Sequence, residues 1–169
     1  WTAIITGRTT ADNQAFERGL KQKVREAGLA DRIVFLGDVE DIALWYRRMT
    51  LFVAPSRNEG FGLTPLEAMA SQTAVVTSDA GSYPSMIREG VNGAMAPAGD
   101  ADALTRAVEP YLKDPALAEA HGRNALEFVA ANFSLAAEAG AIRAVYERLW
   151  AEAESVPAGS GRSRSSVKV

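Results

Sequence analysis

The fold class is decided by residues 50–77, which read Thr50-Leu51-Phe52-Val53-Ala54-Pro55-Ser56-Arg57-Asn58-Glu59-Gly60-Phe61-Gly62-Leu63-Thr64-Pro65-Leu66-Glu67-Ala68-Met69-Ala70-Ser71-Gln72-Thr73-Ala74-Val75-Val76-Thr77. Two short apolar runs, residues 50–54 and 74–77, flank a loop with two glycines and a helical segment over about residues 65–71. Neither run alternates polar and apolar residues, as a strand with one face in water would. The stretch therefore predicts a strand, a helix and a second, parallel strand, with both strands buried on both faces.

The same alternation extends to both sides of this stretch. Further strands are predicted at residues 1–6, 32–37 and 93–97, and helices before Gly28 and over residues 41–49. Only helical patterns follow residue 100. The last helix, over about residues 134–153, carries an apolar stripe that predicts one buried face: Ile142, Val145, Tyr146, Leu149 and Trp150. We therefore predict an α/β fold, a Rossmann-like doubly wound parallel sheet followed by C-terminal helices.

Composition and charge exclude several function classes. The 169 residues include no cysteine and one histidine, His121, which excludes disulfides, thiolate metal sites, a cysteine nucleophile and a histidine-rich metal site. We interpret His121 as a solvated helical residue and not as a catalytic one. Of the 18 basic residues, three lie in a C-terminal tail without acids, so residues 1–154 carry 15 basic against 21 acidic residues. Nucleic acid is therefore not an expected partner.

The chain is predicted to contain one globular domain and a tail. A hydrophobic content of 47% is enough for a core, and we place the domain at residues 1–154. Residues 155–169, rich in Ser and Gly, are predicted to be disordered. There is no run of about 18 apolar residues and no signal-peptide pattern, so we expect no membrane span and a cytoplasmic location. Arg162, Arg164 and Lys168 leave open a peripheral contact with the inner face of the cytoplasmic membrane, although a solvated tail is the simpler interpretation.

The loop after the 50–54 strand is where the sequence predicts a ligand. In an open parallel sheet, ligands bind beyond the carboxyl ends of the strands. Gly60 and Gly62 leave backbone N–H groups accessible to an anion, and a helix beginning at Pro65 would direct its positive end toward the same place. A pyrophosphate group is the expected ligand. The alternative is that the two glycines only form a turn.

Two carboxylates flank these glycines. Glu59 lies in the loop, where it can project into a cleft, and Glu67 lies in the predicted first turn of the helix. A carboxylate accepts two hydrogen bonds at once, so each acid suits two neighbouring hydroxyls of a ribose or a hexose. Glu67 has an alternative role, because Thr64, Pro65 and Glu67 match a capping box with Thr64 as the N-cap. Both roles are compatible, since one oxygen can cap while the other faces a ligand.

The spacing of the two acids, E-x7-E with Gly-Phe-Gly between them and Ala68-Met69-Ala70 after them, resembles the signature of family-4 retaining glycosyltransferases. Similar motifs occur along nearly the whole chain, among them Ile4-Ile5-Thr6-Gly7, Val34-Phe35-Leu36-Gly37, Pro55-Ser56, Asp79-Ala80-Gly81 and Phe133-Ser134. Within the family, the sequence of residues 54–76 most resembles that of lipopolysaccharide-core mannosyltransferases. Gln72 departs from the family's usual glycine, and we expect it to end the helix in a conformation that glycine tolerates better.

The resemblance implies the second, donor-binding Rossmann-like domain of a GT-B enzyme. Glu59 is implied to be the catalytic residue as a binder of the transferred sugar, without acting as a covalent nucleophile, and Glu67 is implied to hold the ribose. The other donor-binding residues implied are Gly60, Phe61, Gly62, Leu63 and Thr64. The implied reaction moves a hexose, mannose from GDP-mannose or else a sugar from a UDP-sugar, onto a glycan or lipid-linked lipopolysaccharide-core acceptor with retained configuration. The nucleotide-sugar is a co-substrate, and neither a cofactor nor a metal is implied.

The chain is also expected to be a fragment, because a strand begins at Trp1 without a preceding Met. By the resemblance it lacks the first, central strand of its sheet, an Arg and Lys pair that neutralises the donor diphosphate, and the N-terminal acceptor domain. We therefore expect it to be inactive alone.

Two other function classes stay open. One is a non-catalytic nucleotide-sugar-binding module, and the other is an epimerase or a glycan phosphorylase on a similar fold. An epimerase is not expected to show the E-x7-E spacing. A phosphorylase needs a pyridoxal-phosphate lysine, whereas the lysines lie on predicted helices or in the tail: Lys21, Lys23, Lys113 and Lys168.

Overall fold

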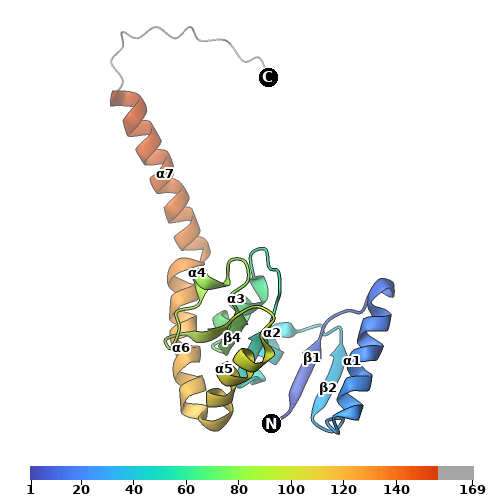
Figure 1. The fold of residues 1–169 in the computed structure, drawn as a ribbon. Coiled ribbons are helices and arrows are strands. Elements are labelled where there is room, and N and C mark those ends of the chain that lie inside the picture. Colours follow the sequence, from blue (N-terminus) through green and yellow to red (C-terminus); the bar gives the residue numbers. More distant parts are fainter. Residues whose placement is uncertain (156–169) are drawn as a thin grey trace. The chain divides into compact units, whose positions relative to one another are not determined.

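The computed structural model describes residues 1–155, and the predicted tail from residue 156 onward lies outside the described residues. The chain divides into two compact units, residues 1–127 and a unit that begins at Phe128. All described strands belong to the first unit and all pair in parallel (Figure 1): β1 (Ala3–Thr6) with β2 (Ile33–Gly37), β3 (Leu51–Ala54) with β4 (Ala74–Ser78), and β4 with β5 (Gly93–Ala96). The predicted α/β class with parallel strands is confirmed.

The described strands form two sheets, β1-β2 and β3-β4-β5, where the sequence predicts one doubly wound sheet. Neither β1 nor β3 has a second sheet neighbour among residues 1–155, and the doubly wound order predicts another strand between these two. The prediction that β1 is buried is wrong for this structure, since Ile4 and Ile5 are 36% and 42% exposed. The reason is that β1 has a neighbouring strand on one side only, so its side chains have no side chains of a second strand beside them.

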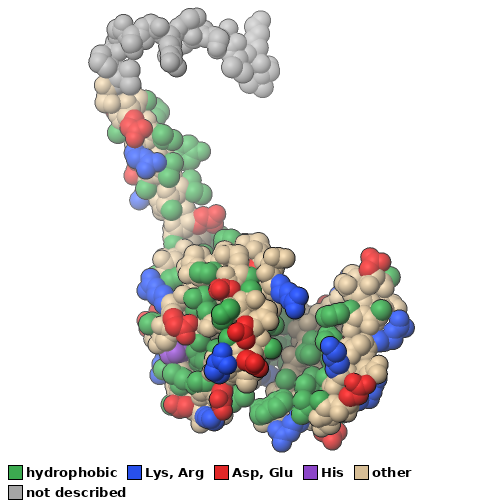
Figure 2. Space-filling model, viewed as in Figure 1, with side chains coloured by type: hydrophobic (Ala, Val, Ile, Leu, Met, Phe, Trp, Pro, Cys, Tyr) green, Lys and Arg blue, Asp and Glu red, His purple; other side chains and the backbone are tan. Residues whose placement is uncertain are grey.

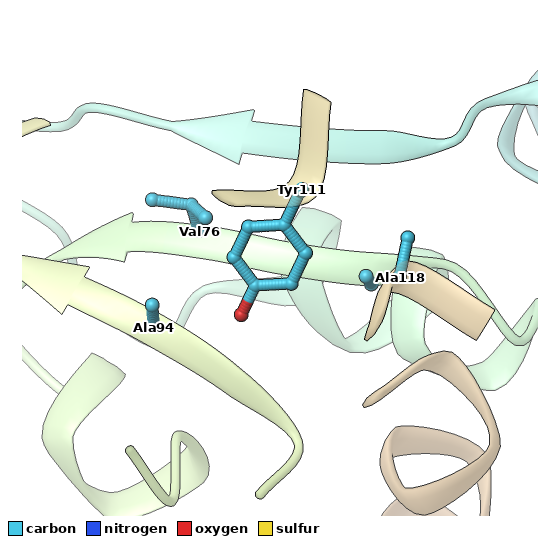
Figure 3. Close-up of a cluster of buried hydrophobic side chains, with 5 residues drawn as sticks. Val76, Ala94, Tyr111 and Ala118 are labelled. Atoms are coloured by element: carbon cyan, nitrogen blue, oxygen red, sulfur yellow. The ribbon is translucent and has the colours of Figure 1, made fainter. Parts of the chain in front are cut away.

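The three-stranded sheet carries the core of the first unit. All five residues of β4 are buried, which agrees with the unbroken apolar run in the sequence. The helix α3 (Leu63–Ala70) packs on β3 and β4, and α5 (Ala101–Lys113) packs on β4 and β5. Figure 3 shows the ring of Tyr111 from α5 among Val76, Ala94 and Ala118, which belong to one buried cluster. This sheet therefore provides a rigid base for the loops at its carboxyl edge.

The helices predicted before Gly28, over residues 41–49 and over about residues 134–153 are close to α1 (Gln14–Glu26), α2 (Ile42–Arg48) and α7 (Leu135–Ser155). The structure adds three helices for which no bounds were predicted: η1 (Ala11–Asn13), α4 (Tyr83–Met86) and α6 (Pro115–Asn132). After α1 the chain turns at Gly28, whose φ of +68° favours glycine. At the start of α2 the Asp41 carboxylate accepts a hydrogen bond from the Leu44 N–H at 3.0 Å.

His121 on α6 is buried, which corrects the prediction of a solvated histidine. Its side chain is 7% exposed, and its Nδ1 lies 2.9 Å from the Tyr111 hydroxyl. The residues beside it on the buried face are small, and a Cβ at Gly122 would overlap the Gln72 carbonyl oxygen. Alanine and glycine give a weak apolar signal, so the sequence pattern did not show that this face of α6 is covered.

The apolar stripe of α7 is exposed among the described residues, so the burial predicted for this face does not come from residues 1–155. Tyr146 and Trp150 are 70% and 71% exposed, and Figure 2 shows hydrophobic side chains along this helix. By length and mean hydropathy (1.3), the helical stretch Pro115–Ser155 could cross a membrane, and 6% of its apolar window is buried. A search for an unbroken apolar run misses this stretch because it contains charged residues. The membrane contact predicted for the basic tail concerns residues outside the described range.

Candidate functional site

The loop between β3 and α3, residues 55–62, is hydrogen-bonded to the 78–83 turn, which runs from the last residue of β4 to the first residue of α4. Because β3 and β4 are adjacent parallel strands, the segments after them meet at one edge of the sheet. Three side chains of the turn donate hydrogen bonds to the loop: Ser78 Oγ to the Ser56 carbonyl oxygen at 2.6 Å, Ser82 Oγ to the Phe61 carbonyl oxygen at 2.6 Å, and the Tyr83 hydroxyl to Glu59 Oε2 at 2.9 Å. The loop that carries Glu59 is thus shaped by the neighbouring turn.

Two glycines allow this close approach. Gly81 has a φ of +55°, and a Cβ there would overlap the Glu59 carbonyl oxygen. Gly62 has a φ of +81°, and its Cβ would lie 2.5 Å from Cε1 of Tyr83. A Cβ at Gly60, by contrast, would meet nothing within 4 Å. The sequence treats Gly60 and Gly62 alike, whereas the structure requires glycine at 62 for conformation and space.

The Glu59 carboxylate is held through both of its oxygens. Oε2 accepts from the Tyr83 hydroxyl and, at 3.4 Å, from Ser56 Oγ, while Oε1 accepts from the Gly60 N–H at 3.1 Å. The hydrogen bond from Tyr83 is the main cause that lowers the pKa of Glu59, against a smaller opposing effect of burial, with further lowering by the Gly60 N–H. Glu59 is therefore ionised at neutral pH. The Gly60 N–H, which the sequence predicts to face pyrophosphate, donates here to the chain's own carboxylate.

Glu67 lies on α3, and the predicted capping box is wrong. The helix begins at Leu63 after the left-handed Gly62, with no side-chain cap, so Thr64 is already its second residue and Glu67 its fifth. Gly62 lets the chain enter the helix earlier than a Thr64 cap would, and Pro65 in the first turn has no N–H to satisfy. Glu67 is exposed and its Oε2 accepts from the Tyr46 hydroxyl at 3.2 Å. Burial, and then the charge of Glu67, raise the pKa of Tyr46 to about 12.

The C-terminal end of α3 has the conformation that the sequence predicts. Gln72 has a φ of +63°, and among the described residues it is the single non-glycine residue with a positive φ. The Thr73 N–H donates to the Ala68 carbonyl oxygen at 3.0 Å, which closes the helix. Gln72 thus adopts the glycine-like conformation that the sequence predicts.

The predicted donor-binding residues gather at the N-terminal end of α3. The side chains of Phe61 and Leu63 are 54% and 63% exposed on either side of Gly62. The N–H groups of Leu63 and Thr64 have no acceptor within the helix, as in the first turn of any α-helix. These groups and the positive end of the helix dipole favour an anion at this place.

Sequence reasoning missed the two tyrosines that hold the acids. Tyr46 is 21 residues from Glu67, and Tyr83 is 24 residues from Glu59. The sequence indicates Tyr46 only as a core or interface residue, and it is buried, 3% exposed. No spacing rule links residues so far apart, because such pairs depend on which strands are neighbours.

A cavity of 190 Å³ adjoins the same loop and is lined by Pro55, Arg57, Ser78, Ala96, Pro97, Gly99, Asp100, Ala101 and Leu104. It lies at the start of α5, where the Asp100 carboxylate accepts from the Ala103 N–H at 2.8 Å. That carboxylate already occupies the positive end of α5, which disfavours a second anion. Within residues 1–155 no three His, Cys, Asp or Glu side chains are grouped to hold a metal ion.

Residues 1–128 match the family model described as Glycosyl transferases group 1. The chain belongs to this family. This glycosyltransferase chain is 63% identical over 149 residues to the lipopolysaccharide core biosynthesis mannosyltransferase LpcC of Rhizobium leguminosarum bv. viciae, covering 88% of the chain and 42% of that protein. It is 45% identical over 151 residues to the corresponding mannosyltransferase LpsB of Rhizobium meliloti, covering 88% and 43%. The solved C-terminal domain of a glycosyl transferase group 1 family protein (LpcC) from Francisella tularensis is 33% identical, with a TM-score of 0.75 over 80% of this chain and 71% of that one.

These comparisons confirm the predicted family, the predicted similarity to lipopolysaccharide-core mannosyltransferases and the fold of a GT-B C-terminal domain. The glycosyltransferase chain spans about two fifths of the length of its curated relatives, 42% and 43%. The roles of Glu59, Glu67 and the loop residues between them stay predictions. The hydrogen bonds of the two acids show which residues hold each carboxylate.

Proposed function

We propose that this chain is the donor-binding part of a retaining hexosyltransferase that moves mannose from GDP-mannose to a lipopolysaccharide-core saccharide. The observation that carries the proposal is the ionised, doubly held Glu59 carboxylate near the N-terminal end of α3, eight positions before a second acid, the exposed Glu67. Membership of the family implies a nucleotide-sugar donor, and the names of the two mannosyltransferase relatives support mannose.

Each part of the site has a separate task in this proposal. The first-turn N–H groups and the dipole of α3 stabilise the negative charge that grows on the leaving pyrophosphate. Glu59 accepts hydrogen bonds from hydroxyls of the transferred sugar, and Glu67 accepts from the ribose diol. Because Glu59 is already engaged by Tyr83 and the Gly60 N–H, it serves as a fixed acceptor and not as a nucleophile.

Calorimetric titration of this chain with GDP, GDP-mannose, UDP and UDP-glucose tests the proposal. We expect GDP-mannose to bind most tightly and GDP to bind more weakly, because GDP lacks the sugar that Glu59 contacts. Tightest binding of UDP-glucose would replace GDP-mannose by a UDP-sugar donor. Absence of binding to every nucleotide and nucleotide-sugar would contradict the proposal.

The transfer itself is tested on a longer protein that also holds the acceptor domain. Transfer of radiolabelled mannose from GDP-mannose to a truncated lipopolysaccharide core, with an α linkage retained from the donor, is the expected result. Donor binding without any transfer would favour the alternative of a non-catalytic nucleotide-sugar-binding module.

A further inference from the structure

We propose that Tyr83 is a positioning residue that holds the Glu59 carboxylate for the donor sugar, and that it thereby sets the affinity for the sugar and leaves the affinity for the nucleotide unchanged. The inference rests on the proposed function, in which Glu59 contacts the transferred sugar. Tyr83 itself is 1% exposed and does not reach a ligand, so its effect must pass through Glu59.

The ring of Tyr83 is fixed in place by its surroundings. Tyr83 is the first residue of α4, and its ring packs directly on Gly62. A Cβ added at Gly62 would lie only 2.5 Å from Cε1 of this ring. The hydroxyl donates to Glu59 Oε2 at 2.9 Å and lies 3.2 Å from Ser56 Oγ. Because the tyrosine has one hydroxyl proton and gives it to Glu59, Ser56 is the donor in the second contact, and its single proton is shared between the Tyr83 hydroxyl at 3.2 Å and Glu59 Oε2 at 3.4 Å. One buried side chain thus connects the start of α3 with the loop acid.

The Glu59 carboxylate needs such a support. It lies on a half-buried loop position beside Gly60, and a free glutamate side chain would lose rotamer freedom on binding a sugar. A carboxylate held in advance avoids much of that loss. Tyr83 and Ser56 engage Oε2, and the Gly60 N–H engages Oε1, which leaves acceptor capacity on Oε1 for a sugar hydroxyl. The arrangement is that of a prepared acceptor.

Tyr83→Phe removes the hydroxyl and keeps the ring that packs on Gly62. Calorimetry with GDP and GDP-mannose gives a sugar increment, defined as the ratio of the two affinities. We expect the sugar increment to fall about tenfold, because the lost hydrogen bond involves a charged group, while the GDP affinity stays within about twofold. Tyr111→Phe is the matched control, since it also removes a buried tyrosine hydroxyl, here the one beside His121. An unchanged sugar increment, or an equal loss of GDP and GDP-mannose affinity, would overturn the inference.

A double-mutant cycle with Glu59→Ala separates positioning from general damage. If Tyr83 acts through Glu59, then Tyr83→Phe changes the sugar increment of the Glu59→Ala variant by less than about twofold. An undiminished tenfold effect in that background would show that Tyr83 acts by another route and would overturn the inference.

The same contact can be tested without any ligand. Carbon-13 NMR of the Glu59 carboxyl should show a higher pKa in Tyr83→Phe than in the parent chain, since Tyr83 supplies the largest lowering effect. Failure of the parent chain to bind nucleotides would defeat the proposed function alone. An unchanged Glu59 titration in Tyr83→Phe would defeat the positioning role, so the two failures are distinguishable.

Discussion

Glu59 and Glu67 make an instructive comparison, because both accept a hydrogen bond from a buried tyrosine and yet depend on different levels of structure. Glu59 lies on a loop whose path requires Gly62 and Gly81, and its carboxylate is held through both oxygens. Glu67 lies on a regular helix, and one of its oxygens accepts a hydrogen bond from the Tyr46 hydroxyl at 3.2 Å. The loop acid therefore depends on tertiary packing, whereas the helical acid is placed mainly by the backbone of α3.

The strongest way to break this comparison is to remove the space that the loop needs. Gly81→Ala places a Cβ against the Glu59 carbonyl oxygen at a φ of +55°, and we expect a loss of about 3 kcal/mol in the free energy of unfolding. The sugar increment should be lost as well, because Glu59 is displaced. Urea denaturation and calorimetry measure the two effects. Gly99→Ala is the control: its φ is +85° with nothing within 4 Å, so we expect a loss of only about 1 kcal/mol.

Replacing each acid by its amide compares the two roles directly. We expect Glu59→Gln to weaken GDP-mannose about tenfold and GDP hardly at all, because only the sugar contact is changed. Glu67→Gln should weaken both ligands by the same factor, about fivefold, because both contain the ribose. Calorimetry with the two ligands gives the result. The same pattern for both variants would mean that the acids do not divide sugar and ribose between them.

The pH dependence of the sugar increment reports the state of Glu59. Hydrogen bonds from Tyr83 and from the Gly60 N–H hold the pKa of Glu59 below its ordinary value of 4.5. The ionised form accepts sugar hydroxyls, so at pH 4.5 the increment should keep more than half of its value at pH 7 and should decline further at lower pH. Titrations at pH 7, 4.5 and 4 test this expectation. A loss of more than half of the increment at pH 4.5 would show that Glu59 is not held as described.

The helical acid should respond more weakly to the loss of its tyrosine. Tyr46→Phe removes a hydroxyl that contacts an exposed carboxylate, and we expect about 1 kcal/mol less stability and about a threefold loss for GDP and GDP-mannose alike. Thermal unfolding and calorimetry measure both. A loss confined to GDP-mannose would assign Tyr46, and with it Glu67, to the sugar.

The smallest change concerns the end of α3 that lies away from the ligand. Gln72→Gly should stabilise the chain by about 0.7 kcal/mol, because a φ of +63° strains glutamine and not glycine. Nucleotide affinity should stay the same. Ser71→Gly, at a φ of −91°, is the control and should slightly destabilise the chain. Stabilisation by both variants would remove the conformational explanation.

Local patterns predicted the parts of the protein that depend on local physics. The apolar runs predicted the parallel strands, and Gln72 was recognised as a residue in a glycine-like conformation. The position of the loop at the end of β3 also followed from the order of the elements. In contrast, the prediction of a capping box at Thr64 was wrong. The helix begins at Leu63 because Gly62 adopts a left-handed conformation, and no local sequence pattern predicts that conformation.

The sequence by itself determined the alternation of strands and helices, the family, and the two acids at the loop and helix that follow β3. Only the tertiary structure decided what holds these acids. Tyr46 and Tyr83 reach Glu67 and Glu59 because residues distant along the chain are brought together, and the pairing of β3 with β4 places the 78–83 turn against the loop. Hydrogen bonds between such distant residues depend on packing, which short-range periodicity does not encode.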